Sequence, residues 1–174
     1  MKFPTLEDIL ENKICERTVS LVGLIFPFLE VHVVLGPKVL CSTTNADFNL
    51  FFKNHLVGPI SELYASQITH MLSFGLMVVL FDVCVRKRLP LTLFSRFNII
   101  QGVLLDIICS FFGIAYSQLT YLVRESVFGE LLANACYFSI IGFILYSMFM
   151  ILFGRFPKIP IVSEGARLNV QLFR

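Results

Sequence analysis

The chain offers few side chains for chemistry, and none of them stands in a recognised catalytic or metal-binding pattern. The sequence has no G-x-S-x-G, no H-E-x-x-H and no phosphate-binding loop. Its three histidines have no cluster of Cys or carboxylate ligands beside them, which a metal centre requires. Its five cysteines form no C-x-x-C pair, and we expect buried reduced thiols, with a disulfide or a metal site as the alternative. We therefore predict no catalytic activity, no cofactor and no bound metal.

Asp106 is the most unusual ionisable residue, because it lies in the middle of a long apolar stretch. It is nine residues from each end of the segment 97–115, which is about 14 Å along a helix. No Lys or Arg shares that depth. A carboxyl group in lipid is costly, so it must be protonated, accept hydrogen bonds from a neighbouring helix, or face a water-filled cavity. Both a structural role and a role in a transport path stay open.

Other polar residues in the apolar stretches form two groups. Asn98 and Gln101, three residues apart on one helical face, are expected to hydrogen-bond between helices. Asp82 is in the same half of its stretch and is expected to pair with Arg86, four residues later. The other group lies in the opposite halves and would line a funnel if its members faced one another: Glu30, His32, His70 and Asn134.

The composition indicates that lipid is the main solvent of the elements that carry these residues. Hydrophobic residues make up 56% of the 174 residues and charged residues only 15%, and the mean hydropathy is +0.79. Soluble domains have about 45–50% apolar and about 25% charged residues. The net charge of +2 does not suggest a basic nucleic-acid-binding face, so we expect no nucleic-acid partner.

Four apolar stretches are long enough to cross a membrane, which takes about 20 residues in a helix. They cover residues 18–36, 66–85, 97–115 and 131–153. Backbone groups in lipid must be bonded within the segment, and runs of this length without alternation are not barrel strands. We therefore predict an all-α integral membrane protein with four transmembrane helices.

The positive charges predict the orientation of these helices. With four spans, both termini and the segment 86–96 share one side. That side carries eleven of the fourteen basic residues and should be the cytoplasm or its equivalent. The eleven are Lys2, Lys13, Arg17, Arg86, Lys87, Arg88, Arg96, Arg155, Lys158, Arg167 and Arg174.

The flanking segments divide the chain into a membrane domain, 17–153, an amphipathic surface segment, 1–16, and a C-terminal tail, 154–174. A second amphipathic surface piece carries Phe48, Phe51, Phe52 and Leu56 on one stripe; packing on the membrane and docking of a partner stay open for it. In the tail, two prolines between residues 156 and 160 predict extended backbone. Ser163 is expected to cap a final helical turn or two.

Three stretches of this sequence resemble the Tic-twenty family, four-span subunits of the translocon at the inner envelope membrane of chloroplasts. They are E-R leading into I-F-P-F-L-E at residues 16–30, R-F-N-I-I-Q-G-V-L-L-D-I at 96–107, and G-R-F-P-K-I-P-I-V-S-E at 154–164. The similarity runs from about residue 17 to residue 170. The second stretch is the most specific, and it contains Asn98, Gln101 and Asp106.

The resemblance implies a multi-pass protein of the plastid inner envelope with both termini in the stroma. It also implies that precursor polypeptides pass through a path formed with other inner-envelope translocon subunits, which connect to the outer-envelope translocon. A polypeptide needs a wetted path, and four apolar helices are too small to enclose one. We therefore expect the chain to form one wall of a shared conduit, with a non-conducting scaffold as the alternative.

Overall fold

The structure is a computed structural model that describes residues 13–36, 39, 51, 54, 55, 58, 59, 62 and 67–171, with only the backbone described at 67–71 and 171. This part of the chain is helical and contains no strand. The helices are α2 (Lys13–Val34), α5 (Gln67–Val85), α6 (Leu93–Ser117), α7 (Tyr121–Arg124), α8 (Val127–Leu152) and α9 (Val162–Gln171). Of the predicted surface segment 1–16, residues 13–16 are the first turn of α2 and the others lie outside the described residues. The second predicted surface piece lies outside the described residues, apart from isolated positions.

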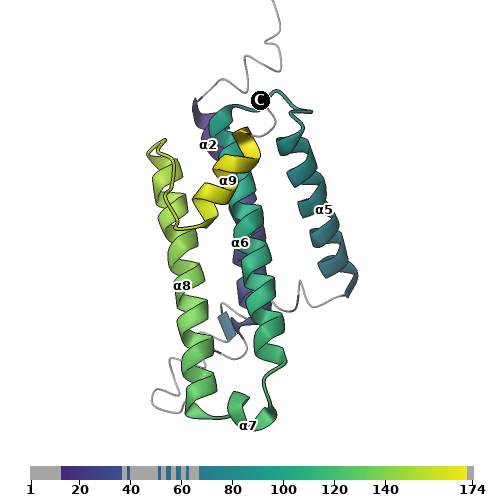
Figure 1. Cartoon of the computed structure of the whole chain (residues 1–174), viewed down its shortest axis with the longest axis vertical. Coiled ribbons are helices and arrows are strands. Elements are labelled where there is room, and N and C mark those ends of the chain that lie inside the picture. The colour runs from purple at the N-terminus through teal and green to yellow at the C-terminus, as the bar shows by residue number, and fades with distance from the viewer. Residues whose placement is uncertain are drawn as a thin grey trace, which may run out of the picture.

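The four long helices run along one axis in alternating directions (Figure 1). α2 and α6 begin at the end of the bundle where α5 and α8 finish, and we call this end the terminal end. Three helices, α2, α6 and α8, are long and apolar enough to cross a membrane. In α5 the apolar portion with described side chains is Leu72–Val85. Arg17 of α2 lies beside Gly154 at the terminal end. Seven of the basic residues expected to share one side lie at helix ends there: Lys13, Arg17, Arg86, Lys87, Arg88, Arg96 and Arg155. Lys158 lies further along the bundle, with its backbone nitrogen 3.4 Å from the Tyr146 hydroxyl, and Lys2 and Arg174 lie outside the described residues.

The closest packing in the bundle is the crossing of α2 and α6, which run in the same direction. A Cβ added to Gly23 of α2 would lie 2.6 Å from the Cα of Ile99 in α6, and one added to Gly102 would collide with the Gly23 carbonyl. Small residues permit such close approach of membrane helices, whose association depends on van der Waals packing. The core continues between α2, α6 and α8 around Leu24, Leu105, Tyr137 and Ile144.

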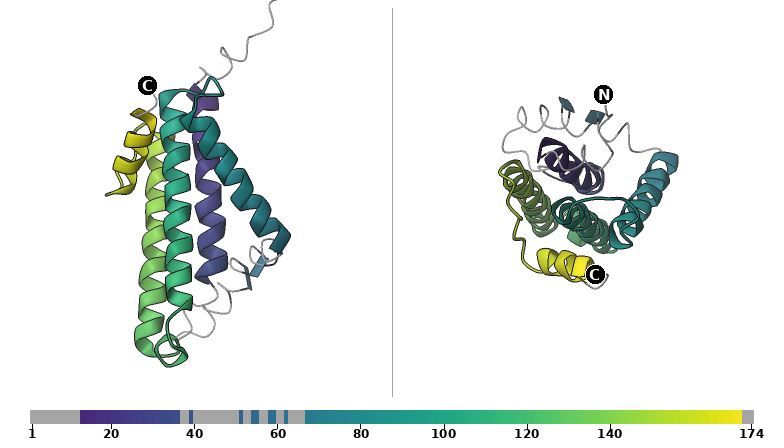
Figure 2. Two further views of the ribbon diagram at one scale, coloured as in Figure 1. Left: turned by 45° about the vertical axis from the view of Figure 1, so that its right-hand side comes forward. Right: turned by 90° about the horizontal axis from the view of Figure 1, so that it is seen from above.

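α5 packs against the bundle mainly through its C-terminal end. Cys84 and Val85 are buried against Phe97 and Ile100 of α6, whereas Leu72 is 70% exposed. Figure 2 shows α5 diverging from α6 as it leaves the terminal end. The contacts that fix its C-terminal end therefore determine where α5 lies.

The helix boundaries differ from the prediction at several places. α2 begins at Lys13 rather than at residue 18, and α8 begins at Val127 rather than at residue 131. α6 begins at Leu93 rather than at residue 97, because Thr92 caps it by accepting a hydrogen bond from the Ser95 backbone N–H. The predicted final turn or two of the tail is a ten-residue helix, α9, and Ser163 is its second residue rather than its cap, with its hydroxyl bonded to Ile159 and Pro157. The four-residue helix α7 connects α6 to α8 and was not predicted.

Candidate functional site: polar residues inside the bundle

Two carboxyl groups, Glu30 of α2 and Asp106 of α6, are buried inside the bundle. Glu30 is 4% exposed and accepts a hydrogen bond of 3.0 Å from the Ser110 hydroxyl. Asp106, one turn before Ser110, is 8% exposed. The buried thiol of Cys109 lies within electrostatic range of both carboxyl groups. Glu30, one of the residues expected to line a funnel, is therefore enclosed by helices, and Asp106 is buried as well.

His32 joins α2 to α8 through both of its ring nitrogens. Its Nδ1 lies 2.6 Å from the Phe28 carbonyl oxygen and its Nε2 lies 3.1 Å from the Tyr137 hydroxyl. Because a carbonyl oxygen only accepts, Nδ1 carries the proton, and the Nε2 of the neutral ring accepts from Tyr137. His32 is fully buried and its hydrogen bonds are satisfied, as a packing residue requires.

Asn98 and Gln101 are buried, but they do not form the predicted hydrogen bonds between helices. The Asn98 amide nitrogen donates to the Phe94 carbonyl of its own helix, at 2.8 Å. Among the described residues, the Asn98 Oδ1, both amide atoms of Gln101 and the Ser147 hydroxyl have no hydrogen-bond partner. An unsatisfied buried polar group costs about 1–3 kcal/mol, so these residues do not hold α6 to its neighbours.

A hydroxyl network that sequence reasoning missed ties α2 to α6 at the terminal end. Thr92 donates to the Glu16 carboxylate at 2.5 Å, and Ser20 and Ser95 both donate to the Glu16 carbonyl, at 2.7 and 3.1 Å. Ser20 and Ser95 are themselves 3.4 Å apart. The helix-capping Thr92 was the available signal, because it places Ser95 in the first turn of α6.

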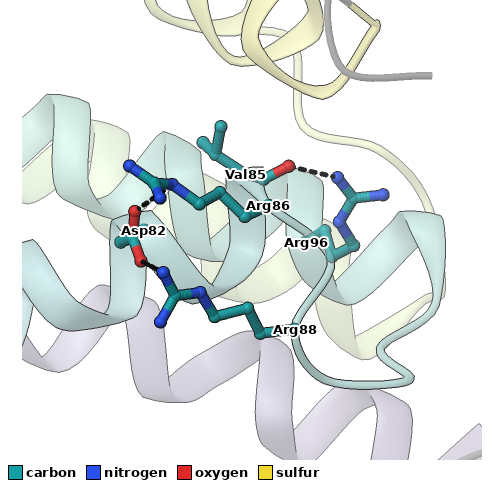
Figure 3. Close-up of polar contacts among 5 residues, drawn as sticks. All are labelled: Asp82, Val85, Arg86, Arg88 and Arg96. Atoms are coloured by element: carbon teal, nitrogen blue, oxygen red, sulfur yellow. Dashed lines mark hydrogen bonds and ion pairs between the residues drawn. The ribbon is translucent and has the colours of Figure 1, made fainter.

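The sequence also did not predict where the Arg96 side chain lies. We counted it among the surface charges, but it is 5% exposed. Its Nε donates to the Cys84 carbonyl at 2.6 Å and its Nη2 to the Val85 carbonyl at 3.3 Å. Figure 3 shows the guanidinium group reaching the end of α5. It thereby satisfies two of the carbonyls that a helix leaves unpaired at its C-terminus, where the helix dipole also favours a cation.

The predicted pair of Asp82 with Arg86 is confirmed, with 2.6 Å between Oδ1 and Nε. Arg88 binds the other carboxylate oxygen at 3.2 Å (Figure 3). Both arginines are more than half exposed. This pairing neutralises Asp82 at the end of α5.

The described polar residues hold helices together and present no constellation for catalysis or metal binding. Within the described residues, no group of three or more His, Cys, Asp or Glu side chains is arranged to hold a metal ion. The side chain of His70, the remaining candidate, lies outside the described residues. Asn134 is half-buried in α8.

Comparison with known proteins agrees with the resemblance found in the sequence. A family model described as chloroplast import apparatus Tic20-like matches residues 2–166. A Tic20 family protein Ycf60 of Gracilaria tenuistipitata var. liui is 27% identical over 94% of this chain and 79% of its own length. The protein of the same name in Porphyra purpurea is 26% identical over 92% of the chain and 78% of its own length. A Tic20 family protein of Synechocystis sp. is 33% identical over 57% of the chain and 62% of its own length.

Proposed function

Since this chain belongs to the Tic20-like family of the chloroplast import apparatus, we propose that it is a membrane subunit of a protein-conducting translocon. In this role it passes precursor polypeptides across the plastid inner envelope membrane. The match of the family model over nearly the whole chain carries the proposal, and three membrane-length helices support it.

The proposed topology has four spans, with α5 as the second and both termini on the stromal side. Three observations support it: the alternating helix directions (Figure 1), the 19-residue length of α5 and the seven basic residues at helix ends of the terminal end. Lys and Arg residues that flank membrane spans are enriched on the cytoplasmic side, whose equivalent in a plastid is the stroma. Residues 17–153 then form the membrane domain, and the terminal end faces the stroma.

The bundle interior is too well filled to be the path itself. Glu30, His32 and Asp106 are buried in helix contacts, and the core between α2, α6 and α8 is apolar. An unfolded polypeptide needs hydrogen-bonding groups or water along its route. We therefore place the path on the outside of this bundle, with other subunits or further copies forming the remaining walls.

A non-conducting scaffold that assembles the translocon is the alternative, and the same burial favours it. Polar residues that hold helices together serve a scaffold as well as a wall. Many outward side chains of α8 are apolar, such as Leu145 and Phe149, and they suit lipid or the helices of another subunit equally.

Depletion of this chain from plastids tests the proposed role. The expected result is that radiolabelled precursors stop at the inner envelope while their passage across the outer envelope continues. Unchanged import after depletion would contradict both versions of the proposal. The scaffold version further predicts that the remaining inner-envelope complex falls apart on native gels. The path-wall version predicts that an import-defective variant of this chain can leave the complex intact.

A further inference from the structure

After α8, the C-terminal tail folds back alongside the bundle, away from the terminal end. After α8 the chain turns at Gly154, whose φ of +66° suits glycine, beside Arg17 at the terminal end. Phe156 then packs edge-on against Phe94 and Phe97 of α6, with ring centroids 5.1 and 5.2 Å apart. α9 runs back toward the terminal end along the side of α6 opposite α2 (Figure 2).

The depth of the turn follows from the residues it touches. A Cβ on Gly165 would lie 3.2 Å from Leu104 Cδ1. Leu104 lies about 16 Å from Leu93, the first residue of α6, at the rise of ~1.5 Å per residue of an α-helix. α6 is about 37 Å long by the same rise, so a hydrocarbon layer of about 30 Å centred on it begins within about 4 Å of Leu93. Gly165 therefore lies about 12 Å inside the layer. Pro160 and Ile161 lie at least as deep, since they line one cavity with Ile108.

The turn is irregular backbone held in place by Ser163. The Ser163 hydroxyl accepts from the Ile159 N–H at 2.6 Å and donates to the Pro157 carbonyl at 3.1 Å. The next residue after Pro160, Ile161, has a φ of +65°, a strained conformation for a β-branched residue. Non-helical backbone at membrane depth is tolerated only where protein buries it or it lines a water-filled space.

The outward side of the tail, which we call the tail face, consists of Lys158, Pro160, Ile161, Glu164 and Arg167. All five residues are exposed. With Ile159 and Ser163 they line a hollow of about 560 Å³. Arg167 also lines a pocket with Leu93 at the terminal end, so its side chain can reach the membrane surface. Lys158, Glu164 and an open turn would therefore meet hydrocarbon if lipid covered this face, and a charge near the middle of the layer costs about 2.5–3.5 kcal/mol.

We propose that the tail face lines a water-filled recess that opens at the terminal end, and that a polypeptide in transit is held in this recess. The second half of this proposal rests on the proposed translocon function. Water fits the face better than a protein partner, because protein interfaces are depleted of charge at their cores. Within the described residues, no ion pair joins Lys158, Glu164 or Arg167 to another side chain. Charges of both signs and an open hollow suit an extended chain of varied sequence.

Thiol reactivity in the assembled translocon tests the recess. In a full-length chain with its five native cysteines replaced, we would introduce Glu164→Cys or Lys158→Cys and apply a charged, membrane-impermeant methanethiosulfonate. Leu145→Cys is the matched control. Leu145 is exposed on α8 next to Tyr146, whose hydroxyl lies 3.4 Å from the Lys158 backbone nitrogen. Leu145 therefore lies at a depth in the membrane similar to that of Lys158. Ala166→Cys, at a buried position of α9, controls for fraying of the helix.

The expected result is modification of both tail-face cysteines at least tenfold faster than of Leu145→Cys and Ala166→Cys. If the tail-face cysteines react no faster than Leu145→Cys, the face does not line a water-filled recess. Crosslinking of those unreactive cysteines to another subunit would show that a protein partner covers the face instead. An arrested precursor should then slow the reaction at Glu164→Cys at least fivefold. If it does not, while the precursor crosslinks elsewhere on this chain, the recess is not the path and the proposed function stands. A precursor that crosslinks nowhere on the chain contradicts the proposed function.

Discussion

Replacement of Arg96 by Met should release α5 from the bundle. The guanidinium group makes two hydrogen bonds to the last carbonyls of α5, at 2.6 and 3.3 Å, and it is buried. A hydrogen bond to a charged group contributes about 1.5–3 kcal/mol, and the longer of these two is the weaker. Loss of the desolvation cost of the cation offsets part of the effect. We expect a net loss of about 3 kcal/mol in the free energy that holds α5 in place.

Hydrogen exchange measured by mass spectrometry reads this local free energy directly. About 3 kcal/mol corresponds to a factor of about 150, since about 1.4 kcal/mol is tenfold. Amides near the C-terminal end of α5 should therefore exchange about a hundredfold faster in Arg96→Met, while those of α8 keep their rates. Arg96→Lys should be intermediate, because an ammonium group lacks the planar fork that reaches two carbonyls.

Arg88→Met is the matched control, because Arg88 lies on the connection from α5 to α6 but pairs with Asp82 at an exposed position. Exposed pairs contribute about 0–1 kcal/mol, so exchange in α5 should rise less than about fivefold. Equal effects of Arg96→Met and Arg88→Met would refute the assignment of Arg96 as the anchor. Equal acceleration in α5 and α8 would show instead that Arg96 stabilises the whole bundle.

The remaining predictions concern interior residues, and each is read from the free energy of unfolding in mixed micelles. Gly23→Ala should destabilise by about 1–3 kcal/mol because its Cβ meets the backbone of α6 at 2.6 Å. Gly142→Ala, with no atom within 4 Å of its Cβ, should be neutral or stabilise by up to about 1 kcal/mol; similar losses in both variants would contradict the close crossing. Gln101→Met should be neutral or stabilising by about 1–2 kcal/mol because it removes an amide without a partner, and a clear loss would indicate a bond to a residue or water at that amide. Tyr137→Phe should cost about 1 kcal/mol by removing the hydrogen bond to His32, and no change would show that this bond contributes nothing net.

Hydropathy and local spacing predicted the parts of the fold that depend on neighbouring residues in the chain. The apolar stretches correspond to α2, α5, α6 and α8, and three of these helices, α2, α6 and α8, are long and apolar enough to cross a membrane. The pair of Asp82 with Arg86 was predictable because its two members are one helical turn apart. Seven basic residues that were expected on one side lie at helix ends of the terminal end, and the side of the membrane that this end faces stays a prediction.

Contacts between distant segments were not predictable in the same way. The His32 ring finds Tyr137 105 residues away, and nothing in a helical pattern specifies which faces of two helices meet. The charge count assigns Arg96 only to one side of the membrane. Its helix begins one turn earlier than predicted, at Leu93, and the side chain reaches the end of α5. Asn98 bonds to its own helix, a local choice that competes with bonds between helices.

The tail shows the limit of reading amphipathic segments from sequence. α9 has apolar residues on one side, Val162, Ala166 and Val170, and such a pattern fits a membrane surface and a groove between helices equally well. Packing of Phe156 on α6 and the hydrogen bonds of Ser163 select the groove. The charged residues of α9 consequently lie at a depth that the pattern alone does not reveal.

Site-specific photocrosslinking of an arrested precursor tests most directly whether this chain is a wall of the translocation path. A photoreactive amino acid would replace Glu164 on the tail face or, as the control, Leu145 on the apolar side of α8, and a radiolabelled precursor would be halted in transit by a folded domain at its C-terminus. We predict a strong adduct between chain and precursor at Glu164, dependent on ongoing import, and at most one-tenth of that yield at Leu145. No precursor adduct at any position of a scan over the exposed residues, in a complex that still imports, would contradict the account.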